Sequence, residues 1–332
     1  MPGIFQAGIC PVFLTKGLCG MEKSIVSAGK KARLHTRLRK SLVVYALFLP
    51  SFLLVLIFHY FPIYGIAMAF EDFSPFKGLL GSDFVGLKHF IYFLSSEKFW
   101  NVFYNTLIIN VYKLIFGFPF PIIFALMLNE LRSKRLKKFT QTVSYLPHFI
   151  SWVVVASILT EVLSPTTGLV NTILGSLFGT EPIYFLTKAN YFRPILVFAE
   201  IWKSFGMNAV YYIAALSGID SELYEAAAID GAGKLRQTWH VTLPGLRNII
   251  IVLLVLQMGT LINVGFEQVF LLYNPTVYEV ADVLSTYTYR LGIESKQYSL
   301  TSAIGLTQSV INFLMVFFAN RLSKKVAGWS LW

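Results

Sequence analysis

Long apolar stretches alternate with short polar segments along most of this chain. Six of the stretches reach about the 20 residues that a helix needs to cross the roughly 30 Å hydrocarbon core of a membrane. They run over 42–66, 102–128, 140–163, 193–216, 248–267 and 301–320. The runs are continuously apolar and lack the alternation of a membrane strand, so they favour helices. The pattern predicts an all-α integral membrane protein with six transmembrane helices.

Composition and charge agree with this prediction. The 332 residues are 55% hydrophobic and 14% charged, which is unlike a soluble globular protein. Lys and Arg gather in the first 40 residues (eight), after the second stretch (five), after the fourth (three) and at the C-terminus (three). Because cytoplasmic loops carry the excess of Lys and Arg, both termini are predicted to be cytoplasmic. The excess of Lys and Arg behind the net charge of +11 therefore lies in the predicted cytoplasmic segments, and we expect no nucleic-acid partner.

These signals predict three regions. Residues 1–40 form a basic cytoplasmic segment, residues 41–322 a transmembrane domain, and residues 323–332 a cytoplasmic tail. Cys10 and Cys19 precede the first apolar stretch on the reducing side, so we expect no disulfide. The residues before Cys10 do not resemble a cleaved signal peptide, and Met21 is an alternative start to Met1.

The chain shows no pattern typical of an enzyme. It has no Gly-x-x-x-x-Gly-Lys-Ser/Thr loop for a nucleotide and no Cys/His cluster with metal-ligand spacing. We therefore expect no catalytic residues, no cofactor and no metal site in this chain.

A polar loop over 217–247, between the fourth and fifth stretches, carries the most specific motif. The motif is Glu225-Ala226-Ala227, then Asp230-Gly231-Ala232, then Leu243-Pro244. Asp220 or Ser221 can cap a short helix that runs to Asp230, because their side-chain oxygens accept first-turn amides. Gly231 and Gly233 then permit a sharp turn before a second helix over about 234–241. The small side chains leave the backbone accessible, so another protein can approach it closely.

This motif resembles the cytoplasmic coupling loop of bacterial type I ABC importer permeases. The resemblance implies that Glu225 contacts a cytoplasmic ATPase subunit, Gly231 makes the tight turn and Asp230 braces the loop. An ordinary Ala-rich loop helix is the alternative, since Ala and Glu favour helices in any context. The joint spacing of all three parts, Leu243-Pro244 included, favours the coupling loop.

Further segments resemble the oligosaccharide and polysaccharide branch of this family, over nearly all of residues 40–332. They are Tyr60 to Gly65, Gly86 to Phe90, Tyr104 to Leu107, Tyr273 to Pro275, Thr286 to Arg290 and Gly328 to Trp332. The resemblance implies a multi-pass protein of the bacterial cytoplasmic membrane that moves oligosaccharides, including uronate-containing ones, by alternating access. It also implies a second homologous permease, two cytoplasmic ATPase subunits and an extracytoplasmic solute-binding protein. The competing hypotheses are an ion-gradient-driven sugar transporter and a membrane enzyme acting on lipid-linked sugars.

Candidate pathway residues lie in and near the fourth stretch. Glu200 and Lys203 are three residues apart on one predicted helix, so they share a face and can form an ion pair. Charges inside a membrane face a bundle interior or an aqueous cavity, which fits either a structural pair or a transport pathway. The other candidates are polar or aromatic groups that suit sugar hydroxyls and ring faces. They are Trp202, Asn208, Tyr211, Tyr212, Glu267 and Gln268.

Overall fold

The computed structural model describes residues 41–42 and 44–328, which fall into two compact units, one ending at Tyr64 and one beginning at Gly65. The first unit is helical from residue 44, with a π-helical turn at Leu56–Tyr60 (η1). A 3₁₀ stretch over Phe61–Phe70 (η2) completes a 27-residue run over Val44–Phe70. The predicted basic segment 1–40, with both cysteines, lies outside the described residues, as do 329–332.

A small hairpin opens the second unit. Strands β1 (Glu71–Asp72) and β2 (Asp83–Phe84) pair antiparallel, with α2 (Gly78–Gly81) between them and α3 (Lys88–Leu94) after them. Lys88 lies 2.9 Å from the Asp72 carboxylate, and its hydrogen bond lowers the pKa of Asp72 below the usual value. Both side chains are more than half exposed, so the pair contributes little stability.

The second apolar stretch forms one 34-residue helical run over Glu97–Glu130. It consists of α4 (Glu97–Tyr112), a π-helical turn at Lys113–Gly117 (η3) and α5 (Pro119–Glu130). Pro119 occupies the first turn of α5, where its missing N–H costs least. The run therefore extends the predicted span 102–128 at both ends.

The third apolar stretch, predicted as a span over 140–163, is broken into two helices. Helices α6 (Lys134–Phe149) and α7 (Trp152–Val162) meet at 97°. Pro147 lies in the last turn of α6, and the Ser151 side chain caps α7 by accepting from the Val154 amide at 3.4 Å. Helix α8 (Leu169–Phe178) and the 3₁₀ turn η4 (Phe185–Thr187) follow.

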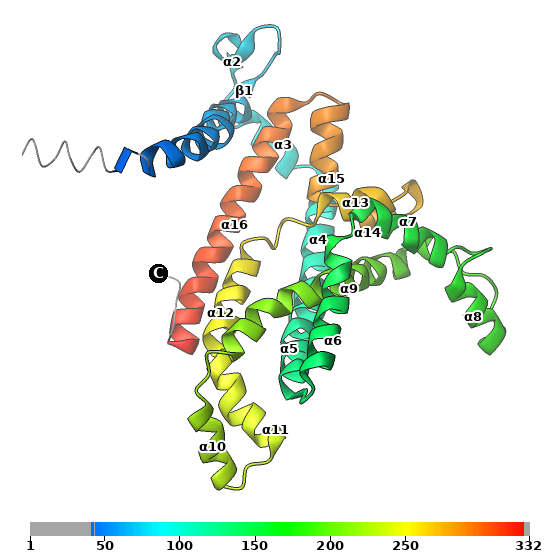
Figure 1. The fold of residues 1–332 in the computed structure, drawn as a ribbon. Coiled ribbons are helices and arrows are strands. Elements are labelled where there is room, and N and C mark those ends of the chain that lie inside the picture. The colour runs from blue at the N-terminus through cyan, green and yellow to red at the C-terminus, as the bar shows by residue number, and fades with distance from the viewer. Residues whose placement is uncertain (1–40, 43, 329–332) are drawn as a thin grey trace, which may run out of the picture. The chain divides into compact units, whose positions relative to one another are not determined.

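The 28-residue helix α9 (Ala189–Leu216) runs through the middle of the second unit and packs against α5, α6 and α12 (Leu243–Met258) (Figure 1). Close packing with α6 is possible because Gly206 faces the α6 backbone; a Cβ there would lie 2.0 Å from the Ser144 carbonyl oxygen. Helix α9 also contributes Ala209 and Tyr212 to a buried cluster with Ala125 of α5 and Leu246 of α12.

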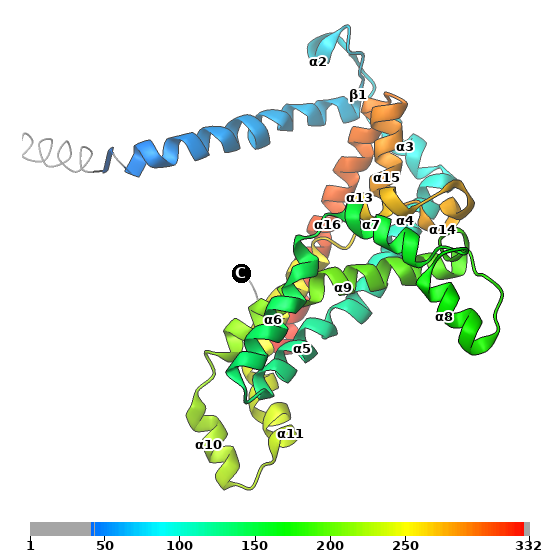
Figure 2. The same cartoon turned by 45° about the vertical axis from the view of Figure 1, so that its right-hand side comes forward.

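The last third of the chain forms two groups of elements at opposite ends of the second unit. The short helices α10 (Ser221–Ile229) and α11 (Lys234–Gln237) lie at one end, and α13 (Phe266–Leu272), α14 (Tyr278–Ala281) and α15 (Leu284–Tyr289) lie at the other (Figures 1 and 2). Short turns link them at Thr238–Thr242 (η5), Pro275–Val277 (η6) and Arg290–Glu294 (η7). Helix α16 (Tyr298–Ala327) begins near α15, runs back alongside α12 (Figure 1) and extends the predicted span 301–320 at both ends.

Four helical runs of the described chain are long and apolar enough to cross a membrane. They are Val44–Phe70, Glu97–Glu130, Lys234–Met258 and Tyr298–Lys325, and the bent α6–α7 pair makes a fifth if it counts as one span. Large apolar side chains such as Ile115, Ile123 and Phe313 are more than half exposed on these helices of the second unit. Such a surface suits lipid rather than water, so the predicted helical membrane class is confirmed.

Candidate functional site

The predicted coupling loop is a helical hairpin whose turn is made by the motif itself. Asp220 caps α10 by accepting from the Glu222 amide at 3.0 Å, which confirms the predicted helix start. At the other end, Gly231 has a φ of +74°, the left-handed conformation that glycine adopts at least cost. The Gly231 amide bonds the Ala228 carbonyl, and the Ala232 amide bonds the Ala227 carbonyl. This pair of bonds is a Schellman motif, which satisfies the last carbonyls of the helix.

Side-chain contacts fix the hairpin to the membrane-length run Lys234–Met258. The Tyr224 hydroxyl lies 3.1 Å from the Thr242 hydroxyl, and Gln237 donates to the Ala232 carbonyl at 2.9 Å. Gly245, two residues after Leu243, packs against the Ile219 side chain. Any force on α10 therefore reaches α12 through several contacts as well as through the chain.

The outer face of the hairpin is available to a partner. Glu225, Ala226 and Asp230 are exposed, and Ala227 and Ala232 are half-buried against the rest of the hairpin. Ile229 is 88% exposed at the tip of α10, and Leu235 of α11 is 79% exposed. Large apolar groups beside small ones on one exposed hairpin are typical of a docking surface. Leu243 and Pro244 begin α12, where Pro244 fits the first turn.

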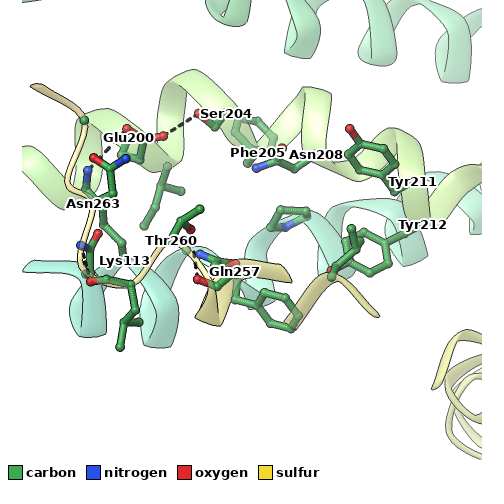
Figure 3. Close-up of a pocket in the computed structure, with 18 of the residues that line it drawn as sticks. Lys113, Glu200, Ser204, Phe205, Asn208, Tyr211, Tyr212, Gln257, Thr260 and Asn263 are labelled. Carbon is green, nitrogen blue, oxygen red and sulfur yellow. Dashed lines mark hydrogen bonds and ion pairs between the residues drawn. The ribbon is translucent and has the colours of Figure 1, made fainter. Parts of the chain in front are cut away.

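A cavity of about 480 Å³ lies between α5, α9, the end of α12 and the π-helical turn η3 (Figure 3). We call it the first cavity. Four of the predicted pathway residues line it, namely Glu200, Asn208, Tyr211 and Tyr212. They lie on α9, with Asn208 two turns after Glu200, and Tyr211 and Tyr212 one turn after Asn208, so much of one helix face is turned toward the space.

Sequence reasoning missed the opposite wall of the first cavity. This wall includes Lys113, Asn110, Gln257, Thr260 and Asn263. The last two belong to residues 259–265, a non-helical segment between α12 and α13. Its polar residues fell inside or beside a predicted helix and gave no separate signal. Non-helical backbone at membrane depth is buried in protein or lines a cavity, so a predicted break in this helix would have pointed to the wall. No pattern in the sequence predicted that break.

Charged and amide groups from three elements meet at the edge of this cavity. The Lys113 ammonium lies 2.6 Å from the Gln268 side-chain oxygen and 3.6 Å from the Glu200 carboxylate. Gln268 donates in turn to the Leu196 carbonyl at 2.6 Å, and Ser204 donates to Glu200 at 2.9 Å. Lys113 and Gln268 are buried, whereas the Glu200 side chain is one-third exposed toward the cavity. The cluster is compensated in charge and presents a carboxylate to the open space.

The predicted ion pair between Glu200 and Lys203 was wrong. Glu200 pairs with Lys113 instead, and the Lys203 ammonium donates to the carbonyls of His148 at 2.8 Å and Ile150 at 2.5 Å. It also lies 5.6 Å from the centre of the Trp152 ring. These groups flank the 97° break between α6 and α7. Lys203 thus occupies a structural position at that break and does not line the first cavity.

Three other pathway candidates lie outside the first cavity. Trp202 is 37% exposed on another face of α9, and Glu267 is exposed on α13. Gln268 is fully buried and reaches the cavity only through Lys113. Within the described residues, no group of three His, Cys, Asp or Glu side chains is placed to hold a metal ion.

Comparisons with known proteins agree with this geometry. The sequence profile of the family described as "Binding-protein-dependent transport system inner membrane component" matches residues 117–328. The chain belongs to this family. It is the permease component of an ABC importer and a multi-pass protein of the inner membrane, so the resemblance seen in the sequence is confirmed. The family match favours ATP-driven import over the ion-gradient alternative, and the related proteins are permease subunits, not enzymes.

Two relatives from Bacillus subtilis cover most of this permease. The polygalacturonan/rhamnogalacturonan transport system permease protein YteP is 43% identical over 92% of this chain and 95% of its own. Protein LplB is 42% identical over 92% of this chain and 95% of its own. Among solved structures, a bacterial alginate ABC transporter in complex with an alginate pentasaccharide-bound periplasmic protein is 41% identical, with a TM-score of 0.82. That match covers 90% of this permease and all of the compared chain.

Proposed function

We propose that this permease carries oligosaccharides derived from acidic polysaccharides, delivered by an extracytoplasmic solute-binding protein. The first cavity is the observation that carries the proposal, because it is polar, lies between membrane-length helices and contains both ring faces and hydrogen-bonding groups. The names of similar proteins support the substrate class, since they refer to polygalacturonan, rhamnogalacturonan and alginate. The first and last of these polymers consist of uronate sugars.

The lining of the first cavity suits such a sugar. Phe118, Trp152 and Tyr211 offer aromatic faces for pyranose rings, and Asn208 and Gln257 offer amides for the hydroxyl groups. In this proposal a uronate carboxylate replaces Glu200 as the partner of the Lys113 ammonium while the sugar passes. Lys113 pairs with Glu200 before the sugar arrives and with the uronate while it passes, so the buried ammonium always has a partner. Because Glu200 competes with the uronate for Lys113, the sugar is held weakly enough to leave.

We further propose six membrane spans with both termini in the cytoplasm. The four membrane-length runs, the bent α6–α7 pair and the 28-residue α9 supply six helical segments. The position of the α10–α11 hairpin at the end of the unit opposite α13–α15, together with the distribution of Lys and Arg, supports a cytoplasmic hairpin.

The same arrangement supports coupling to a separate ATPase. The exposed motif from Glu225 to Ala232 docks on a cytoplasmic ATPase subunit, and Tyr224 passes its movement to η5 and α12. The complete importer in this proposal contains a second homologous permease and two ATPase subunits. Alternating access then follows from rigid-body movement of the helices that enclose the first cavity.

The test is uptake of labelled oligogalacturonides by vesicles that contain this permease, its partner permease, the ATPase and the binding protein, with and without ATP. Gly231→Val forces a β-branched side chain into the left-handed region, whereas Gly233 has an ordinary φ of −68° and open space at its Cβ. A left-handed L-residue costs about 1–2 kcal/mol, so we expect about tenfold lower uptake for Gly231→Val and little change for the matched Gly233→Val.

Three outcomes would each contradict one part of the proposal. Uptake that proceeds on an ion gradient without the ATPase would restore the secondary transporter. Equal uptake by the two glycine variants would show that the turn at Gly231 does not couple ATP to transport. ATP-dependent uptake of neutral oligosaccharides but not of oligogalacturonides would retain the permease and replace the substrate class.

A further inference from the structure

The charged side chains of the first cavity lie together at one edge of it. Among the described residues of its lining, Lys113 and Glu200 are the ones that carry a charge, and they lie 3.6 Å apart (Figure 3). The Lys113 side chain is 10% exposed and that of Glu200 is 33% exposed. The cation is therefore the more deeply buried member of the pair.

Gln268 is the other partner of this ammonium. It lies on α13, is fully buried and does not itself line the first cavity. Its side-chain oxygen accepts from the Lys113 ammonium at 2.6 Å, and its side-chain nitrogen donates to the Leu196 carbonyl at 2.6 Å. Because a carbonyl can only accept, the second bond fixes which end of the amide faces the lysine. Gln268 thus holds Lys113 from the buried side, while Glu200 meets it beside the cavity.

An amide at position 268 satisfies the ammonium without neutralising it. A buried ammonium requires acceptors, and a neutral oxygen supplies one while the positive charge remains for a partner beside the cavity. A carboxylate at this position would place two negative groups against one positive group. It would also lack the N–H that the Leu196 carbonyl accepts. Of the two groups, only the amide leaves the charge of Lys113 to be balanced beside the cavity.

The two bonds of Gln268 also link the elements that carry the charges. Lys113 lies in the π-helical turn η3, and Leu196 lies about one turn before Glu200 on α9. Gln268 contacts both elements from α13. Hydrogen bonds from outside a site hold its functional groups in one orientation, so Gln268 sets how the Lys113 ammonium is presented to the cavity.

We infer that Gln268 is a positioning residue that selects for anionic sugars, because it holds the Lys113 ammonium where a uronate carboxylate can exchange with Glu200. The inference rests on the proposed function and adds to it that recognition of the carboxylate depends on a buried amide outside the cavity. A neutral sugar has no group that replaces Glu200, so its binding does not depend on the charge at position 268.

The competing explanation is a cluster that only holds α13 and η3 against α9. Such a cluster would affect every substrate equally, because it acts through the fold. Its carboxylate would also have no reason to face open space, whereas Glu200 lines the first cavity and is the most exposed member of the cluster. The two explanations therefore differ in their effect on charged and uncharged forms of one sugar.

The test measures binding of labelled trigalacturonate and of its methyl ester by equilibrium dialysis. The protein is the detergent-purified importer with both permeases and both ATPase subunits, without the binding protein. Gln268→Glu adds a negative charge beside Lys113, so we expect about tenfold weaker binding of trigalacturonate, equivalent to about 1.4 kcal/mol. Binding of the ester, which has the same rings and no carboxylate, should change little.

A double variant separates charge from structure. Gln268→Glu with Glu200→Gln restores one carboxylate for one ammonium, so we expect it to recover most of the affinity for trigalacturonate. Asn171→Asp is the matched control, because Asn171 is a buried amide that donates to the Ser164 and Ile183 carbonyls and lies outside the cavity. It removes an amide donor without adding charge to the cluster, so the ratio of the two affinities should stay at the wild-type value.

Several results would overturn the inference. Equal weakening for the acid and the ester, or a double variant as weak as Gln268→Glu alone, would assign Gln268 a structural role only. If Gln268→Glu does not assemble, Gln268→Met gives the same comparison, because it leaves Lys113 to Glu200 alone and should weaken binding of the acid more than that of the ester. A wild-type importer that binds neither sugar would instead refute the proposed substrate class, so the two proposals fail separately.

Discussion

The close contact of α6 with α9 permits a quantitative test at Gly206. A Cβ at this position would lie 2.0 Å from the Ser144 carbonyl oxygen and 2.6 Å from its carbonyl carbon. Real Cβ atoms keep at least 3.0 Å from such neighbours, so Gly206→Ala must move α6 and α9 apart by about 1 Å. The same movement lengthens the bonds from Lys203, one turn earlier on α9, to the carbonyls at the end of α6.

The two contributions have opposite signs. Replacing a helix-interior glycine by alanine stabilises by about 0.5–1 kcal/mol, because the unfolded chain loses freedom. Overpacking of a close contact costs about 1–3 kcal/mol, and the strained contact here is with backbone, which cannot rotate away. We therefore expect Gly206→Ala to lower the free energy of unfolding by about 1–2 kcal/mol.

Thermal unfolding of the detergent-purified permease measures this difference. Gly175→Ala in α8 is the matched control, because its Cβ would meet only an ordinary contact, 3.7 Å from the Thr180 carbonyl. The control should unfold at or above the wild-type temperature, and Gly206→Ala below it. If the two alanine variants unfold at the same temperature, the helices do not approach each other at Gly206 and the packing argument is refuted.

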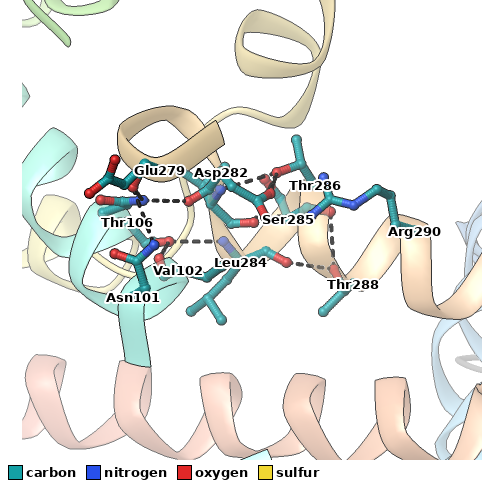
Figure 4. A network of polar contacts seen from close by, with 12 residues as sticks. Asn101, Val102, Thr106, Glu279, Asp282, Leu284, Ser285, Thr286, Thr288 and Arg290 are labelled. Atoms are coloured by element: carbon teal, nitrogen blue, oxygen red, sulfur yellow. Dashed lines mark hydrogen bonds and ion pairs between the residues drawn. The ribbon is translucent and has the colours of Figure 1, made fainter. Parts of the chain in front are cut away.

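Two further predictions concern the cations of Lys203 and Arg290. Lys203→Met removes the hydrogen-bond donor for two carbonyls at the α6–α7 break. A buried unsatisfied group costs about 1–3 kcal/mol, so we expect a lower unfolding temperature for the detergent-purified variant. An unchanged unfolding temperature would show that water replaces the ammonium. Burial disfavours the Arg290 cation, but the hydrogen bond and attraction from Asp282 outweigh it and raise its pKa (Figure 4). Asp282→Ala leaves this guanidinium without its carboxylate, so we expect the free energy of unfolding to fall by about 3 kcal/mol. The double variant Asp282→Ala with Arg290→Met should recover part of this loss. No recovery would mean that the loss is unrelated to the ion pair.

The helical hairpin of α10 and α11 was predictable because its signals are local. A capping Asp220, a run of small helix formers and Gly231 determine a helix and its left-handed end within a dozen residues. The apolar stretches predicted the helical membrane class, but the shapes of the helices were less predictable. The break in the third stretch depends on Pro147 together with Lys203, which lies more than 50 residues later in the chain.

The polar contacts of the cavity were less predictable, for a geometric reason. Helical spacing shows that Glu200 and Lys203 share a face, but it does not show which way their long side chains extend. In the structure Lys203 extends toward α6, and Glu200 meets Lys113, 87 residues earlier in the chain. Lys113 sits in a π-helical turn, whose extra residue per turn alters side-chain direction and leaves no clear signal in the sequence.

The non-helical segment 259–265 beside the first cavity bears on how substrate range can change during evolution. The Leu261 carbonyl accepts from Asn110 at 2.7 Å, and the Val264 carbonyl accepts from Ser285 at 3.1 Å, so this segment is held in place through main-chain atoms that every residue type possesses. Substitution of side chains along 259–265 can therefore alter what the first cavity accepts without removing the segment's own carbonyl acceptors. A family member can therefore acquire a new sugar by changing the side chains of this segment while its main chain keeps the same place in the fold.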